Sequence, residues 1–171
     1  MATNASIVSV DEYLRTSYKP ACEYIDGVLH QKPMPTRKHG LIQARLAHLI
    51  TMSFRNFEAA SEVTVQIRTG RYLVPDLVVQ RCDRIQDPYP SEPVHLCVEI
   101  LSPDDRMSEI FAKCEEYHAW GVETAWVVDP EGQRAWEYRN GRRPAEVSGS
   151  GSLDADGISI SLPELFSVLW S

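Results

Sequence analysis

The sequence predicts an α/β fold in which a mixed central β-sheet is flanked by helices and preceded by an amino-terminal β-hairpin. Residues 94–101 form a continuous apolar run, as expected of a central strand that is covered on both faces. An amphipathic segment over residues 106–120 and a second apolar run over residues 124–128 follow. Because strand-helix-strand units normally return parallel to the first strand, the two apolar runs should be neighbours in one sheet.

Three further elements are expected in the amino-terminal third. Residues 10–14 should form a short helix, and the Asp26-Gly27 pair between β-prone residues predicts a hairpin over residues 23–29. After a proline-rich break, apolar residues between 39 and 57 recur with a period of about 3.6. This spacing predicts one long amphipathic helix that reaches Phe57.

The middle of the chain predicts a strand pair and a loop. Residues 63–67 and 73–79 are strand-like and flank a turn at Gly70, which favours an antiparallel pair with a local bend at Pro75. Three prolines within residues 87–93 predict the loop. Residues 102–105 should cap the helix at 106–120, which is expected to end at Gly121.

At the carboxy-terminal end, residues 134–138 are expected to form an edge strand, and residues 158–160 a short strand after a flexible stretch at 148–152. Ser161 and Glu164 have the spacing of a capping box, which predicts a short helix through Leu169. A chain of 171 residues fits one compact domain, so residues 1–171 are interpreted as a single domain with its core between about 10 and 170.

Composition narrows the class of protein. Four cysteines without a Cys-x-x-Cys pair, and a start at residues 1–6 without a basic and apolar signal, favour a reduced, cytoplasmic protein. No apolar stretch is long enough to span a membrane. The net charge of -7, from 17 basic and 24 acidic residues, disfavours a broad nucleic-acid-binding surface but permits a local one.

Glu99 is the residue that most needs an explanation. It lies inside the apolar run 94–101, and the two-residue period of a strand puts it on the same face as Cys97 and opposite to Val98. An unpaired carboxylate in an apolar interior costs several kcal/mol, so a proton, a cation of the chain or a metal ion must neutralise it. Its position predicts a functional site.

Asp76 is the expected partner of Glu99, because it follows Pro75 in the neighbouring strand-like run. Two carboxylates on adjacent strands repel each other unless a divalent cation lies between them, and oxygen ligands suit magnesium or manganese. His95, Cys97 and Cys114 offer a zinc site as an alternative, but they lack the close spacing of zinc ligands. The carboxylate pair therefore predicts a metal-dependent hydrolytic site.

Lys113 is the candidate cation from the chain. It follows Glu99 on the helix predicted to cross back over the sheet, at the edge of the buried helix face, from where it can reach the strand ends. The competing interpretation is a surface lysine whose aliphatic stem alone is buried.

Several motifs occur in a characteristic order. They are Glu23-Tyr24-Ile25-Asp26-Gly27, the prolines before His39, Pro75-Asp76-Leu77-Val78-Val79, Val98-Glu99-Ile100-Leu101-Ser102-Pro103, Lys113 with Tyr117, and Gly121-Val122-Glu123 leading to Trp126-Val127-Val128-Asp129-Pro130. Taken together they resemble the Uma-type restriction endonuclease family of the PD-(D/E)XK nuclease superfamily, over roughly residues 10–170. The resemblance implies a restriction-endonuclease-like core.

The same resemblance implies roles for the candidate residues. Asp76 and Glu99 match the metal ligands, with the Ile100 carbonyl as a further ligand and magnesium or manganese as the ion. The superfamily's lysine usually stands two residues after the second acid, where this chain has Leu101. Lys113, supplied by the following helix, matches the Uma-type pattern instead.

Four accessory residues complete the expected site. Glu23 matches an acid that binds or orients a second metal, or else is a surface charge of the hairpin. His39 matches a histidine at the head of the long helix, or else merely begins that helix. Glu109 stands where relatives usually have aspartate. Tyr117 either hydrogen-bonds within the site or packs, and packing is the favoured interpretation.

The expected function is a magnesium-dependent endonuclease that hydrolyses phosphodiester bonds in DNA. A nuclease of this size contacts one strand per subunit, so we expect a homodimer. Trp136 and Leu169-Trp170 either form its contacts or complete the core. Two alternatives remain open at this point. One is a catalytically idle scaffold that binds a partner or oligomerises, and the other is a hydrolase of small phosphodiesters.

Overall fold

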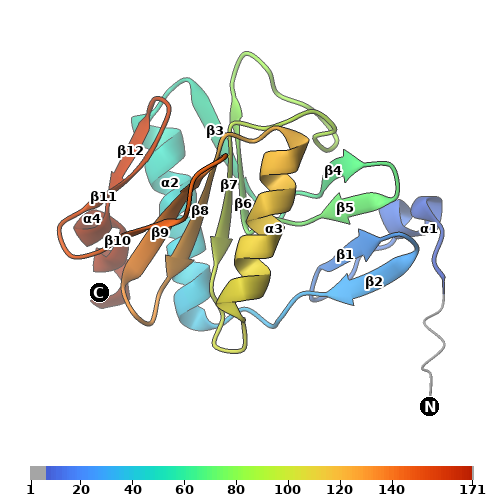
Figure 1. Cartoon of the computed structure of the whole chain (residues 1–171), viewed down its shortest axis with the longest axis horizontal. Helices are drawn as coiled ribbons and strands as arrows, with labels where there is room; N and C mark the ends of the chain where they lie inside the picture. Colours follow the sequence, from blue (N-terminus) through green and yellow to red (C-terminus); the bar gives the residue numbers. More distant parts are fainter. Residues whose placement is uncertain (1–6, 171) are drawn as a thin grey trace.

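The computed structural model describes residues 7–170 and shows a mixed β-sheet with helices on both faces (Figure 1). The central sheet has six strands in the order β10-β9-β8-β7-β6-β3. These strands are β3 (Phe57–Ser61), β6 (Leu77–Arg81), β7 (Leu96–Ile100), β8 (Thr124–Asp129), β9 (Arg134–Arg139) and β10 (Ala145–Val147). The predicted α/β class with a mixed central sheet is confirmed. Residues 1–6, on which the expected lack of a signal segment rests, lie outside the described residues.

Helices cover the central sheet on both sides (Figure 1). The helices of the chain are α1 (Val10–Arg15), which packs against the small sheet described below, α2 (Arg37–Ser53), α3 (Met107–Trp120), α4 (Leu162–Phe166) and a 3-10 helix, η1 (Ser167–Trp170). None of the helices within residues 7–170 has the length and apolar character needed to cross a membrane.

The central crossover has the predicted form. β7 and β8 pair in parallel, with Glu99 opposite Val127, and α3 connects them. α3 ends at Trp120, and its C-cap is the predicted Gly121, whose φ of 123° suits a residue without a Cβ. The predicted cap at its start is wrong, because the N-cap residue is Arg106 and makes no side-chain cap bond. The Asp105 carboxylate instead accepts a hydrogen bond from the Ser102 amide at 2.7 Å.

Strand β7 separates two hydrophobic layers. Leu96, Val98 and Ile100 lie in the cluster that includes the buried face of α2. Cys97 lies in the cluster that includes the buried face of α3. Glu99 shares the α3 face with Cys97, as the alternation of side chains along a strand requires.

A smaller antiparallel sheet with the order β2-β1-β5-β4 lies beside the central sheet (Figure 1). Its strands are β1 (Cys22–Ile25), β2 (Val28–Gln31), β4 (Val65–Arg68) and β5 (Arg71–Leu73). The predicted hairpin is confirmed as β1 and β2, joined at Asp26 and Gly27. Both turn residues have positive φ, 48° and 94°, as a type I′ turn requires.

The strand predicted over residues 73–79 is interrupted, and this correction bears on the site. β5 ends at Leu73 in the small sheet, whereas β6 begins at Leu77 in the central sheet and pairs antiparallel with β7. Asp76 therefore lies directly before β6 rather than within a strand. Pro75 has no N–H to donate to a ladder, so the chain leaves one sheet here and enters the other.

Other predicted boundaries also shift. α2 ends at Ser53, because Phe57 opens β3 at an edge of the central sheet. β9 is not an edge strand, because β10 pairs on its outer side. The stretch predicted as flexible ends at Ser152 with β11 (Ser152–Ala155), which forms a hairpin with β12 (Ile158–Ser161). The predicted cap at Ser161 is confirmed, since its hydroxyl accepts the Glu164 amide.

Candidate active site

Charged side chains from five separate segments line one cavity of about 340 Å³. β1 supplies Glu23, the residue after β2 is Lys32, Asp76 precedes β6, β7 supplies Glu99 and α3 supplies Lys113. A bidentate ion pair holds α3 against the small sheet, with Arg71 Nη2 at 2.5 Å from Glu116 Oε1. The docking of these elements thus brings three carboxylates and two ammonium groups together.

Asp76 is held from three sides. Its Oδ2 accepts the Ile100 amide at 2.7 Å, and His39 Nε2 lies 3.3 Å from the same oxygen. Its Oδ1 accepts Lys32 Nζ at 2.7 Å. Burial alone would raise the pKa of Asp76. The hydrogen bond to His39 and the charge of Lys32 outweigh burial and lower the pKa to well below its usual range. Asp76 is therefore an ionised carboxylate of fixed orientation.

Glu99 points from β7 towards α3, as the strand alternation predicts. Its Oε1 accepts the Tyr117 hydroxyl at 2.5 Å and lies 2.9 Å from Lys113 Nζ. Burial raises the pKa of Glu99, the charges of Asp76 and Glu23 add to the effect, and Lys113 opposes it. Glu99 is consequently a carboxylate that needs a nearby cation to stay ionised.

Lys113 reaches the strand from the middle of α3. Its Nζ lies 2.6 Å from Glu23 Oε1 and 2.9 Å from Glu99 Oε1, and its side chain is 14% exposed. Burial alone would lower the pKa of Lys113, but the charges of Glu99 and Glu23 raise it above its ordinary value. The alternative of a surface lysine is wrong, because the ammonium itself lies between two carboxylates.

Glu23 is likewise part of the site rather than a free charge on the hairpin. Besides its contact with Lys113, its Oε1 accepts the Val74 amide at 2.9 Å. That bond ties β1 to the connection that carries Asp76. Glu23 therefore links the small sheet to the carboxylates of the central sheet.

Lys32 is the site residue that sequence reasoning missed. Its Nζ donates to the Val74 carbonyl at 2.8 Å and to Asp76 Oδ1 at 2.7 Å, across 44 residues of sequence. It stands in a proline-rich segment between Gln31 and Pro33, where no periodicity sets the direction of a side chain. The sequence did contain one signal for such a residue. A buried Asp76 needs a nearby cation as much as Glu99 does, and Lys113 can serve only one of them.

The accessory candidates differ in how they are placed. His39, in the first turn of α2, is 4% exposed and contacts Asp76. Tyr117 hydrogen-bonds to Glu99, so the interpretation that it only packs is wrong. Ile100 lines the cavity and anchors Asp76 through its amide. Glu109 also lines the cavity but is exposed, and its Oε1 lies 3.9 Å from the guanidinium of Arg106, the N-cap residue of α3.

The two central carboxylates fit a hard divalent cation. Magnesium is commonly held by one or two carboxylates and keeps several waters, so a third side-chain ligand is not required. Carboxylate oxygens are donors of the kind that magnesium and manganese prefer.

The zinc alternative is wrong. Within the described part of the chain, no three His, Cys, Asp or Glu side chains form a group that could hold a metal ion. His95 packs its ring against Phe57, with centroids 4.4 Å apart, while Cys97 and Cys114 lie in the buried layer beside α3. Burial raises the pKa of both thiols, which disfavours the thiolate form that zinc binds.

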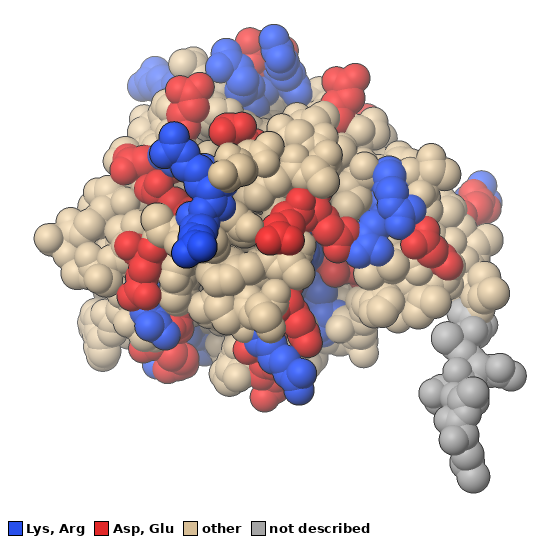
Figure 2. Space-filling model, in the orientation of Figure 1, with Lys and Arg blue, Asp and Glu red and all other residues tan. Residues whose placement is uncertain are grey.

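Charged side chains are mixed on the face of the molecule shown in Figure 2. Lysine and arginine alternate with aspartate and glutamate across the visible surface. This view agrees with the net charge of -7, which does not favour a broad basic surface.

Comparisons with known proteins bear on this geometry. A crystal structure described as a putative nuclease of DUF820 from Anabaena variabilis ATCC 29413 has a TM-score of 0.80 and 26% identity, covering 95% of this chain and 99% of that one. It confirms the predicted nuclease-like fold. A cryo-electron microscopy structure of a DrdV-DNA complex reaches a TM-score of 0.44 at 16% identity, covering 79% of this chain and 11% of that one. No curated protein matches the chain.

A family model confirms the resemblance that the motifs indicate. The Uma2 family, described as "Putative restriction endonuclease", matches residues 10–170 and so includes every candidate site residue. With this match over nearly the whole chain, and with its nuclease-like fold, the protein belongs to the Uma2 family of restriction-endonuclease-like nucleases.

Proposed function

We propose that this protein is a metal-dependent endonuclease that hydrolyses phosphodiester bonds in DNA. Asp76 and Glu99 would hold a magnesium or manganese ion, with the Ile100 carbonyl as a further ligand. The observation that supports this proposal best is the pair of buried carboxylates in one cavity, with the ammonium of Lys113 2.9 Å from Glu99. Burying charged groups costs folding free energy, and clusters of such groups are typical of catalytic sites.

The chain's own groups have distinct tasks in this proposal. When bound, the ion would polarise the phosphodiester and lower the pKa of a bound water. The Lys113 ammonium orients that water or neutralises charge on the phosphoryl oxygens during in-line attack. The Ile100 amide and His39 hold Asp76, so its carboxylate does not need to reorganise. Tyr117 holds Glu99 in the same way.

Glu23 has two possible tasks, and its contacts favour one. Its Oε1 lies 2.6 Å from Lys113 Nζ and accepts the Val74 amide, so the carboxylate already fixes the lysine beside Glu99. We therefore assign Glu23 as a positioning residue that directs Lys113 towards Glu99.

A twofold dimer would allow two such sites to cut both strands of a duplex. The expected contact at Trp136 is not supported, because this side chain is 8% exposed and β10 covers the outer edge of β9. Trp170 is 74% exposed and remains the candidate contact.

The test is a cleavage assay with plasmid DNA in magnesium and in EDTA. The parent should cut only in magnesium, and Glu99→Gln should be inactive although folded. Glu58→Gln is the matched control, since it removes the same charge at an exposed position of β3. Cleavage by Glu99→Gln at the rate of the control would refute the assignment.

The two alternatives predict other results. An idle scaffold would bind no magnesium or manganese at millimolar concentration in calorimetry. A hydrolase of small phosphodiesters would turn over nucleotide substrates faster than plasmid DNA or RNA. The acidic net charge of the protein is no obstacle to binding such small substrates.

A further inference from the structure

A second and larger cavity adjoins the candidate active site. Its volume is about 950 Å³, and it shares Lys32, Pro33, Pro35 and Glu62 with the cavity that holds the carboxylates. We call it the tyrosine pocket, because Tyr13, Tyr18 and Tyr89 contribute to its lining. The shared residues make the two cavities neighbours along one surface, so a ligand in the first can extend into the second.

The tyrosine pocket presents aromatic faces. Tyr13 is 5% exposed and stacks with Tyr18 at a centroid distance of 5.9 Å and an interplanar angle of 22°. Tyr89 packs edge-on against Tyr72, with centroids 6.1 Å apart. Tyr18 and Tyr89 are both half-buried, so part of each ring remains open to a ligand. Flat aromatic surfaces of this kind bind flat rings.

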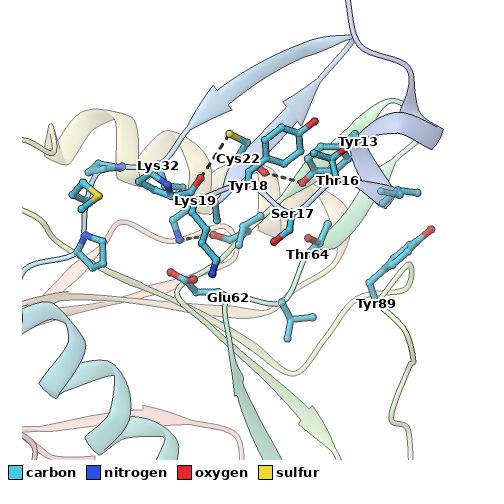
Figure 3. A pocket seen from close by; sticks show the side chains of 18 of the residues that line it. Tyr13, Thr16, Ser17, Tyr18, Lys19, Cys22, Lys32, Glu62, Thr64 and Tyr89 are labelled. Atoms are coloured by element: carbon cyan, nitrogen blue, oxygen red, sulfur yellow. Dashed lines mark hydrogen bonds between the residues drawn. The ribbon is translucent and has the colours of Figure 1, made fainter.

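Polar groups lie among these rings. Figure 3 shows the Lys19 side chain running towards Glu62, with Ser17 and Thr64 on the same side of the pocket and Tyr89 far from Lys32. Glu62 is exposed and has a φ of 52°, a conformation that is strained in a residue with a Cβ. Hydroxyls, an ammonium and a carboxylate are the donors and acceptors that the edge of a nucleobase requires.

We propose that the tyrosine pocket receives an unpaired nucleobase of the strand whose phosphodiester lies at Asp76 and Glu99. This inference rests on the proposed nuclease function. A base can stack on the tyrosines and donate its amino or ring N–H groups to the Glu62 carboxylate, whereas an ionised phosphate has no aromatic face and only accepts hydrogen bonds. The volume also lies in the range of pockets that enclose small ligands.

The proposal specifies the class of substrate. A base inside a duplex is stacked and paired, so it cannot enter a concave pocket unless it flips out. DNA that is single-stranded or has an unpaired nucleotide beside the cleavage site should therefore bind better than a fully paired duplex. A base that stacks on aromatic side chains also supplies affinity that the acidic surface does not.

The test uses a short single-stranded DNA that carries 2-aminopurine, whose fluorescence is quenched on stacking. Binding is measured in EDTA and again in calcium, for the parent, Tyr18→Leu and Tyr89→Leu. Phe111→Leu is the matched control, because Phe111 is a half-buried aromatic residue that packs edge-on against Trp136 and lines neither cavity. Thermal melting of all four proteins verifies that they are folded.

We expect quenching with the parent and with Phe111→Leu, and at least about a fivefold rise in Kd for each tyrosine variant. The same probe in a fully paired duplex should bind more weakly. Equal Kd values in the parent and both tyrosine variants, equal affinity for the duplex, or no quenching in either buffer would overturn the proposal.

A separate assay of magnesium-dependent cleavage distinguishes a failure of the pocket proposal from a failure of the nuclease function. Tyrosine-dependent quenching without cleavage would support the pocket and refute the nuclease function. Cleavage without tyrosine-dependent quenching would refute the pocket and leave the nuclease function standing.

Discussion

Replacing Lys32 by methionine should destabilise the metal-free protein. Lys32 Nζ lies 2.7 Å from Asp76 Oδ1, and the two side chains are 13% and 4% exposed. Removing one partner of a buried ion pair costs about 3 to 5 kcal/mol. Because Ile100 and His39 still contact Asp76, we expect the lower end, about 3 kcal/mol. For a domain of this size that loss lowers the Tm by about 6 to 12 °C.

The same variant should bind magnesium more tightly. The Lys32 ammonium occupies Asp76 Oδ1, so a metal ion that takes this oxygen must first displace it. Without the ammonium this cost disappears, and about 3 kcal/mol corresponds to a gain of up to about 100-fold in affinity. Saturating magnesium should therefore raise the Tm of Lys32→Met more than that of the parent.

Differential scanning calorimetry with and without magnesium, together with titration calorimetry, measures both effects. Lys38→Met is the matched control, since Lys38 Nζ lies 2.6 Å from Glu131 Oε2 in an ion pair whose side chains are 43% and 59% exposed. An exposed pair of this kind contributes about 0 to 1 kcal/mol. The reasoning is refuted if Lys32→Met loses no more stability than the control, or if its affinity for magnesium equals that of the parent.

Three other predictions concern the same region. Lys113→Met should abolish plasmid cleavage and lower stability, because Glu99 and Glu23 then face each other without a cation; an unchanged cleavage rate would contradict the role of Lys113. Tyr117→Phe should lose about 1.5 to 3 kcal/mol in urea unfolding, since it removes a buried hydrogen bond to Glu99, and unaltered stability would argue against that bond. Burial, together with the charge of Glu23, raises the pKa of Tyr13 from 10.0 to about 12, so the stabilisation from its neutral form is complete below pH 10 and is lost as the pH rises towards 12. Tyr13→Phe should resist this alkaline loss when unfolding is followed by circular dichroism, and an identical alkaline midpoint in both proteins would show that Tyr13 has no part in it.

Much of the candidate site follows from local periodicity. A strand alternates its side chains, so Glu99 was predicted to face the helix that follows it, and the structure places it there. The turn of a helix put Lys113 near the edge of the buried face, and its ammonium does reach Glu99. The Asp-Gly turn likewise predicted the hairpin that carries Glu23.

Other predicted element boundaries are wrong where the local sequence pattern conflicts with the pairing of distant strands. Phe57 continues the apolar spacing of α2, but it belongs to β3, because its backbone pairs with β6. The sequence predicts β9 as an edge strand because β10, with only three residues, is too short to show a strand pattern of its own. In both places hydrogen bonds to a distant strand decide the structure, and no local pattern encodes them.

The sequence by itself determined the α/β class, the parallel crossover and the direction in which Glu99 and Lys113 point, because each depends on the regular period of one element or on a short connection. Only the tertiary structure decided that Asp76 lies between two sheets, that Lys32 pairs with it across 44 residues, and that the tyrosine pocket adjoins the carboxylates. These features depend on how the small sheet docks against the central one. Such docking is set by the packing of surfaces far apart in the sequence, for which a residue's neighbours along the chain give no periodic signal.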